Sequence, residues 1–173
     1  MTLSIEYNIY PKHYLFGKEL MKLSNRSQYG VRALFDVAYF SEGRRVQIHA
    51  ISRRQGISRR FLEQIFYSLK KAGLVESKRG PKGGYLLTRP PGEITIGKII
   101  RVLEGPIEPV PCKTMEQDGS ACKYMEKCVT RMVWDEAGMM ISRYFDSITI
   151  QDLCLRADQM GLEKEEKMMM YNI

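Results

Sequence analysis

Three cysteines in one short segment are the residues of this chain with the clearest capacity for chemistry. Cys112, Cys122 and Cys128 lie in the sequence PCKTMEQDGSACKYMEKC, with nine residues between the first two. Thiolates are soft ligands, which select zinc, copper(I) or iron–sulfur clusters. Zinc prefers four closed nitrogen and sulfur ligands, and the two histidines, His13 and His49, are distant in sequence. An iron–sulfur cluster, zinc and free surface thiols therefore remain the alternatives for this segment.

The cellular compartment bears on how these thiols are used. No apolar run approaches the roughly 20 residues of a membrane span. The first 20 residues also lack the pattern of a secretory signal, so we expect a cytoplasmic protein without a membrane partner. Cytoplasmic cysteines are ligands or free thiols more often than disulfides. The fourth cysteine, Cys154, stands between two leucines, and we expect a buried thiol there.

Positive charge is concentrated in about a quarter of the chain. The chain carries a net charge of +7, but residues 44–89 hold twelve Lys or Arg and only two acids, Glu63 and Glu76, a net charge of +10. The remaining residues have a net charge of −3. A clustered basic surface attracts polyanions and supplies sequence-independent affinity for nucleic acid. A solvated basic surface is the alternative, which the motif in the same stretch disfavours.

That motif is a pair of helices joined by a tight turn. Apolar spacing predicts a first helix that Ser24 or Ser27 caps and that ends near Ser41. A short helix over 48–55 follows, then a turn at Gly56, and a third helix capped by Ser58. Two helices joined by a short glycine-containing turn are typical of a helix-turn-helix. The third helix is the predicted recognition helix, whose candidate base-reading residues are Ser58, Arg59, Arg60, Glu63 and Gln64.

Two short β-prone runs flank RGPKGG after this helix, which predicts a hairpin and therefore a winged helix. Its tip carries Lys78, Arg79 and Lys82, which suit phosphates or the minor groove. Thr95 is then predicted to cap a helix that Gly105 and Pro106 end.

A long amphipathic helix is predicted beyond the cysteine segment, over 129–148. Its apolar stripe consists of Val129, Met132, Val133, Ala137, Met140, Ile141, Tyr144, Phe145 and Ile148. Such a stripe must be covered, and a second copy of the same helix is the simplest partner. The alternative is that the helix folds back on its own domain.

These expectations give a mainly α fold class with a small β-hairpin wing: a winged helix-turn-helix followed by a long C-terminal dimerisation helix. The expected organisation is an extension over 1–20, the winged helix over 21–105, the cysteine loop over 106–128, the dimerisation helix and C-terminal segment over 129–160, and a tail over 161–173. The chain shows no catalytic constellation, phosphate-binding loop or paired carboxylates, so we expect neither an enzyme nor a small-molecule substrate.

The segments MKLSNRSQYGVRALFDVA, GISRRFLEQIFYSLKKAGLVESKRGPKGGYLL, PPGEITIGKIIRVLEG and FDSITIQDL together resemble the winged-helix regulators typified by the iron–sulfur cluster regulator, IscR. The resemblance extends in order from Met21 to about Leu155. It implies a homodimer that binds a double-stranded DNA operator as a repressor. It further implies an iron–sulfur cluster on the three cysteines, 2Fe-2S rather than 4Fe-4S, and control of cluster-assembly genes. Sensing of nitric oxide or redox state, or cluster-free regulation through thiols or zinc, stays open within the same family.

Two features depart from the cluster-assembly regulators: the residue three positions past the third cysteine, and the spacing of nine residues between Cys112 and Cys122, which is longer than in those relatives. Those relatives have a histidine ligand three residues past the third cysteine, where this chain has Arg131. In other relatives a carboxylate on the partner's first helix takes that role, and the matching position here is Gln28. The resemblance also implies that Glu63 discriminates between operators. The sequence leaves the fourth ligand open.

Overall fold

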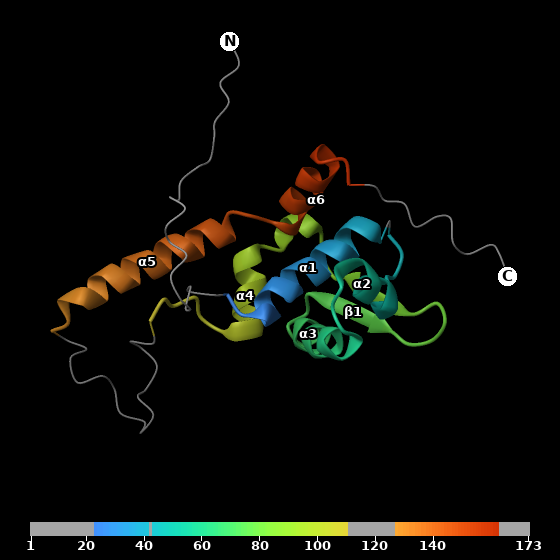
Figure 1. Cartoon of the computed structure of the whole chain (residues 1–173), viewed down its shortest axis with the longest axis horizontal. Coiled ribbons are helices and arrows are strands. Elements are labelled where there is room, and N and C mark those ends of the chain that lie inside the picture. Colours follow the sequence, from blue (N-terminus) through green and yellow to red (C-terminus); the bar gives the residue numbers. More distant parts are fainter. Residues whose placement is uncertain (1–22, 42, 111–126, 163–173) are drawn as a thin grey trace, which may run out of the picture.

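The computed structural model describes residues 23–41, 43–110 and 127–162. Its elements in chain order are α1 (Asn25–Phe40), α2 (Ile48–Gln55), α3 (Arg59–Lys71), β1 (Val75–Lys78), β2 (Gly84–Leu87), a 3-10 turn (Pro91–Glu93), α4 (Ile96–Glu104), α5 (Val129–Asp146) and α6 (Ile150–Gln159). Helices and the antiparallel hairpin gather around α1, while α5 extends away from this body (Figure 1). The arrangement confirms the predicted fold class.

The body is held together by apolar faces that converge on α1. Leu34 of α1, Leu62 and Phe66 of α3, and Ile99 of α4 are all completely buried in one core. Gly30 allows α4 to approach α1 closely, because a Cβ atom there would lie 2.1 Å from Leu103 Cδ1. The core therefore fixes α3, the predicted recognition helix, against α1 and α4.

A buried ion pair joins α1 to α2. Asp36 is 0% exposed, and the Arg54 guanidinium donates to both of its carboxylate oxygens, at 2.9 and 2.6 Å. Gln55 donates a third hydrogen bond to Asp36 at 3.0 Å, and Arg54 lies over the ring of Phe40. Burial of a carboxylate is tolerable only with such full pairing, so this cluster sets the angle between the two helices.

The predicted helix caps are confirmed, with one position resolved. The Ser24 side chain accepts from the Arg26 N–H at 3.1 Å and is the cap of α1, whereas Ser27 lies buried inside the helix. Thr95 caps α4 by accepting from the Lys98 N–H at 3.1 Å. Gly56 adopts a left-handed conformation with φ 64°, which ends α2 and starts the turn into α3.

The C-terminal part of the chain divides between the body and α5. Helix α5 ends at Asp146, two residues before the predicted end, because the next residues pair with the strand-like segment before α4. The Ile96 N–H donates to Ile148 O and the Ile150 N–H donates to Ile94 O, both at 2.9 Å. Ile148, a member of the predicted exposed stripe, therefore packs against the core.

Helix α6 then packs along α1. The hydroxyl of Tyr39 lies 2.8 Å from the Asp158 carboxylate and 2.7 Å from Leu162 O. The pKa of Tyr39 is raised to about 12, mainly by burial and then by the hydrogen bond and negative charge of Asp158. Cys154 packs against the core but is only partly buried, which differs from the buried thiol predicted from the sequence.

Candidate nucleic-acid interface and cysteine site

Helix α3 presents one polar face and buries the other. Ser58 is its N-cap and accepts from the Phe61 N–H at 3.4 Å, so this hydroxyl is engaged by its own helix. Arg59, Arg60, Glu63 and Gln64 are all exposed. Leu62, Ile65, Phe66 and Leu69 occupy the buried face. The structure thus brings the predicted base-reading residues together on one solvent-facing surface.

The hairpin is fixed beside α3 by contacts at its base. Tyr85 on β2 stacks on Phe66 of α3, with ring centroids 4.0 Å apart, and pairs with Val46 through two backbone hydrogen bonds of 2.9 and 2.8 Å. Gly84 has φ 137°, and a Cβ atom there would lie 2.5 Å from Val46 O. Only glycine fits this crossing.

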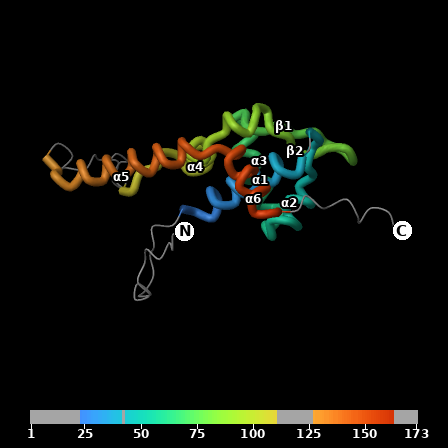
Figure 2. Tube along the Cα trace, turned by 90° about the horizontal axis from the view of Figure 1, so that it is seen from above, coloured from blue at the N-terminus to red at the C-terminus, as the bar shows by residue number. Residues whose placement is uncertain are grey.

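The turn of the hairpin projects from the body (Figures 1 and 2). Lys78, Arg79 and Lys82 are exposed on it, as predicted for a wing tip. Their ammonium and guanidinium groups can therefore reach a polyanion without displacing any part of the core.

A groove runs between α3, the start of α2 and the wing. Its lining includes Gln47, His49, Glu63, Tyr67, Lys70, Lys78 and Arg79. Sequence reasoning named Glu63, Lys78 and Arg79 but missed Gln47, Tyr67 and Lys70. His49, interpreted from the sequence as an ordinary surface residue, is exposed at the edge of this groove. Tyr67 could have been found from its spacing, because a residue seven positions after Arg60 lies on the same face of the helix.

The cysteine site is only partly within the described residues. Cys112 and Cys122 lie outside them, and Cys128 is the residue directly before α5. Its sulfur lies 3.1 Å from the Thr130 hydroxyl oxygen. That hydroxyl and the Arg131 backbone N–H stabilise the thiolate and lower the pKa of Cys128. The chemistry of this donor suits a metal thiolate, although residues 23–41, 43–110 and 127–162 contain no group of three metal-binding side chains.

The two residues considered for a fourth ligand have other contacts in this structure. The Arg131 guanidinium pairs with the Asp135 carboxylate at 3.3 Å, one turn along α5. The Gln28 side-chain amide donates to Leu23 O at 2.9 Å and is exposed on α1.

Both ends of the cysteine segment are anchored. Before it, Glu104 at the end of α4 accepts from the Ser24 hydroxyl and from the Ser27 N–H. Burial alone would raise the pKa of Glu104, but these hydrogen bonds outweigh burial and lower it. After it, Cys128 directly precedes α5, and the C-terminal end of α5 is joined to α4 by an ion pair of Asp146 with Arg101. The described residues that flank the segment therefore contact α1, α4 and α5.

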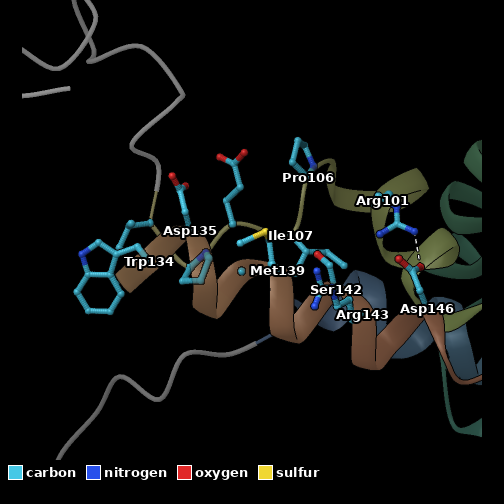
Figure 3. Close-up of a pocket in the computed structure, with 13 residues that line it drawn as sticks. Arg101, Pro106, Ile107, Trp134, Asp135, Met139, Ser142, Arg143 and Asp146 are labelled. Carbon is cyan, nitrogen blue, oxygen red and sulfur yellow. Dashed lines mark hydrogen bonds and ion pairs between the residues drawn. The ribbon is translucent and has the colours of Figure 1, made fainter. Parts of the chain in front are cut away.

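Residues 106–110 run along one face of α5 and form a groove with it (Figure 3). Gly138 permits the contact, since a Cβ atom there would lie 3.0 Å from Pro109 Cδ. Trp134 lies at one end of this groove, and Arg101 with Asp146 lies at the other (Figure 3).

The opposite face of α5 is apolar, and none of residues 23–41, 43–110 and 127–162 covers it. Exposed on it are Val129 at 80%, Val133 at 58%, Met140 at 69% and Tyr144 at 61%. Among the described residues, no helix is long and apolar enough to cross a membrane.

Comparison with known proteins identifies the architecture. The family model described as "Rrf2: Iron-dependent Transcriptional regulator" matches residues 23–156. The chain belongs to the Rrf2 family of transcriptional regulators. Within this family it is 38% identical over 133 residues to the HTH-type transcriptional regulator IscR of Cronobacter sakazakii, which covers 77% of this chain and 80% of that protein. IscR of Citrobacter koseri is also 38% identical, over 77% of this chain and 79% of its own length.

Solved structures of Rrf2-type regulators agree with the fold. The structure of IscR from T. potens matches with a TM-score of 0.66 and 37% identity, covering 85% of this chain and 93% of that one. CymR, the global cysteine regulator of B. subtilis, matches with a TM-score of 0.63 and 33% identity, covering 79% of this chain and 98% of that one. The chain is an IscR-like, DNA-binding transcriptional regulator with a winged-helix fold.

Proposed function

We propose that two copies of this chain form a repressor whose affinity for its operator depends on an iron–sulfur cluster held by Cys112, Cys122 and Cys128. The observation that carries this proposal is the position of Cys128. It directly precedes α5, the helix whose apolar face is uncovered, and the cysteine segment starts where α4 leaves the DNA-binding body. A ligand bound by this segment would therefore act on the connection between the winged-helix body and α5.

The DNA contacts in this proposal divide by chemistry. Arg59 and Arg60 open the recognition helix and read base edges, since bidentate arginine–guanine pairing is the commonest specific contact. Gln64 suits adenine, and Glu63 is an acid on a basic surface that selects against some operators. Lys78, Arg79 and Lys82 on the wing bind phosphates or the minor groove and set the register.

The partner for the uncovered face of α5 is a second copy. Val129, Val133, Met140 and Tyr144 lie on one side of the helix, opposite the side that residues 106–110 cover. The 18 residues of α5 span about 27 Å, enough for several turns of helix-on-helix contact. Twofold association also places two recognition helices for two half-sites about one helical turn of DNA apart.

The cluster is the coupling element in this scheme. Cys112, Cys122 and Cys128 would hold the cluster, which would supply redox-sensitive and displaceable iron–thiolate bonds. At the two ends of this segment, Glu104 bonds to α1 and Cys128 directly precedes α5, so a cluster held there would act between the body and the dimer helix. The spacing of the two recognition helices must match the spacing of the two half-sites on DNA. Loss of the cluster therefore changes operator affinity only if the protein with the cluster and the protein without it bind DNA differently.

We favour a 2Fe-2S cluster over 4Fe-4S, with control of cluster-assembly genes, as the resemblance to the assembly repressors implies. The fourth ligand is not Arg131, because a guanidinium is a poor ligand and this one pairs with Asp135. Gln28 is exposed and can offer its amide oxygen from the partner subunit, while its nitrogen bonds Leu23 O.

A second candidate function has its own support. The absence of a histidine at position 131 and the 33% identity to CymR favour a sensor of nitric oxide or redox state, or a cluster-free regulator that uses its thiols or zinc. Three thiolates with a weak fourth ligand release a cluster more easily than four strong ligands do.

Anaerobic purification followed by visible absorption and Mössbauer spectroscopy tests both candidates. We expect a coloured protein with iron and sulfide, and loss of colour in Cys112→Ala, Cys122→Ala and Cys128→Ala. Cys154→Ala is the matched control, because Cys154 lies on α6, and it should keep the cluster. Operator binding by each variant is then compared with holo protein. A colourless wild type containing zinc would support the cluster-free form of the second candidate, and equal operator affinity of coloured and colourless protein would remove the cluster from regulation.

A further inference from the structure

One aromatic side chain on α3, the proposed recognition helix, is largely exposed to solvent and is not part of the core. Tyr67 is 72% exposed, although its neighbour Phe66 is completely buried. Within the described part of the chain, no hydrogen bond, ion pair or ring contact fixes it. Isolated surface aromatics are common and carry no meaning by themselves. The position of this one is what gives it meaning.

Tyr67 lies on the same face of α3 as the predicted base-reading residues. It is seven residues, close to two full turns, beyond Arg60, and three beyond Gln64. All three side chains are exposed. A helix that puts Arg60 and Gln64 against base edges must therefore direct Tyr67 toward DNA as well.

The surroundings of Tyr67 are suited to nucleic acid. It lines the groove between α3 and the wing together with Lys70, Lys78 and Arg79, with Glu63 as the acid of that lining. Lys70 is held across the groove by a 2.8 Å hydrogen bond to Ser77 on β1. The cations on α3 and on the wing suit the phosphates that flank a groove of DNA. The apolar ring between them would then face a base edge.

We infer that Tyr67 is a specificity-determining residue that packs its ring on the C5 methyl of a thymine in the major groove. This inference rests on the proposed DNA interface. The thymine methyl is the apolar group that base pairs present in the major groove, so it is the complement for an aromatic ring with no fixed polar partner. The seven-residue separation corresponds to about 10 Å along the helix. At a rise of about 3.4 Å per base pair, the ring reads two to three base pairs away from the contact of Arg60.

Selection from a library of random DNA duplexes tests the position of the contact. The wild type, Arg60→Ala, Tyr67→Ala and Tyr67→Phe proteins are each used to enrich binding sites. We expect Tyr67→Ala to lose a preference for thymine two to three base pairs from the positions that change in Arg60→Ala. Tyr67→Phe keeps the ring and should enrich the wild-type sequence.

Replacing that thymine by uracil tests the contact itself. Uracil lacks one methyl group, so the wild type and Tyr67→Phe should lose about fourfold in affinity per half-site, the value of one buried methyl group. Tyr67→Ala should bind both duplexes equally. Because Tyr67 is exposed, unfolding temperatures of the variants should match the wild type and exclude a folding defect.

The outcomes separate this inference from the proposal beneath it. If the wild type enriches no sequence, the proposed base-reading interface fails. If Arg60→Ala changes the enriched sequence while Tyr67→Ala responds to uracil as the wild type does, only the role of Tyr67 is overturned. Equal loss in Tyr67→Phe and Tyr67→Ala would likewise overturn it, because the hydroxyl and not the ring would then make the contact.

Discussion

The body of this regulator and its α5 arm use the same kind of residue in opposite ways. Leu62, Phe66 and Leu69 recur at helical spacing in α3 of the body and are completely buried. Val129 and Met140 recur at helical spacing in α5 and remain 80% and 69% exposed. Figure 2 shows the reason, since α5 leaves the body and its far end has no other described helix beside it. Periodicity thus determines which residues share a face, and only a partner determines what that face contacts.

The charged side chains of the two regions also differ in burial, being enclosed in the body and partly exposed on α5. In the body, Asp36 is fully buried and paired with Arg54 and Gln55. In the arm, Arg131 and Asp135 form a pair four residues apart whose side chains are 31% and 38% exposed. The body thus buries and fully pairs its carboxylate, whereas the charged pair of the arm stays partly exposed.

The strongest test of this contrast is a charge on the open face of α5. We expect Met140→Glu to weaken the dimer at least about a hundredfold, roughly 3 kcal/mol, because association would bury an unpaired carboxylate. Sedimentation velocity measures this change. Met139→Glu is the matched control, since Met139 is 50% exposed but lines the groove with residues 106–110. If both variants stay dimeric, the Met140 face is not the dimer contact.

Removing one carboxylate from each region measures the difference in packing. Asp36→Ala should lower the free energy of unfolding by about 3–5 kcal/mol, the usual result of breaking a buried pair. Asp135→Ala should change it by about 0.5 kcal/mol or less, as for other surface pairs on helices. Urea unfolding followed by circular dichroism gives both values. Comparable losses would show that α5 is as tightly held as the body.

Two arginines distinguish base reading from backbone binding within the body. Arg60→Ala should relax operator preference at a cost of about 1–3 kcal/mol. Arg79→Ala, on the wing, should weaken all duplexes similarly and reduce the slope of log affinity against log salt by about one. Titrations on an operator and an unrelated duplex at several salt concentrations measure this. The division of roles is wrong if both variants lose specificity equally.

The smallest expected effect is a loss of stability at high pH. An ordinary tyrosine ionises near pH 10, whereas the pKa of Tyr39 is raised to about 12. The unfolded chain therefore releases this proton first, so the stabilisation is complete below pH 10 and is lost as pH rises from 10 to 12. The pKa of Tyr85 is also raised, so Tyr39→Phe should reduce this loss without abolishing it. Thermal unfolding from pH 9 to 12 compares the two proteins, and identical profiles would contradict a role for Tyr39.

Local chemistry explains why much of the body was predictable. Ser24, Ser58 and Thr95 cap the helices they were expected to cap, since a hydroxyl before an apolar-periodic run satisfies free backbone N–H groups wherever the helix lies. The hairpin followed from the turn residues between two β-prone runs. The basic residues of the interface were visible for the same reason, because charge density is a property of sequence.

Features that depend on distant neighbours were not predictable. Tyr67 and Lys70 gain their significance from the wing across the groove, and Gln47 from its contact with Pro81 O at 2.6 Å. The early end of α5 arises because Ile148 pairs with the segment before α4. No pattern within α5 contains that information.

The sequence by itself determined every α-helix except α6, the wing, the basic surface and the clustering of three cysteines, because propensity, capping, charge and spacing act over a few residues. The tertiary structure decided which apolar side chains are buried against the core and which stay exposed. Ile148 and Phe145 turn out to pack on the core, while Val129 and Met140 do not. It also decided that Glu104 and Cys128, at the two ends of the cysteine segment, join the DNA-binding body to the open helix. The physical reason is that burial and hydrogen bonding between elements depend on their packing in space, which no short stretch of sequence encodes.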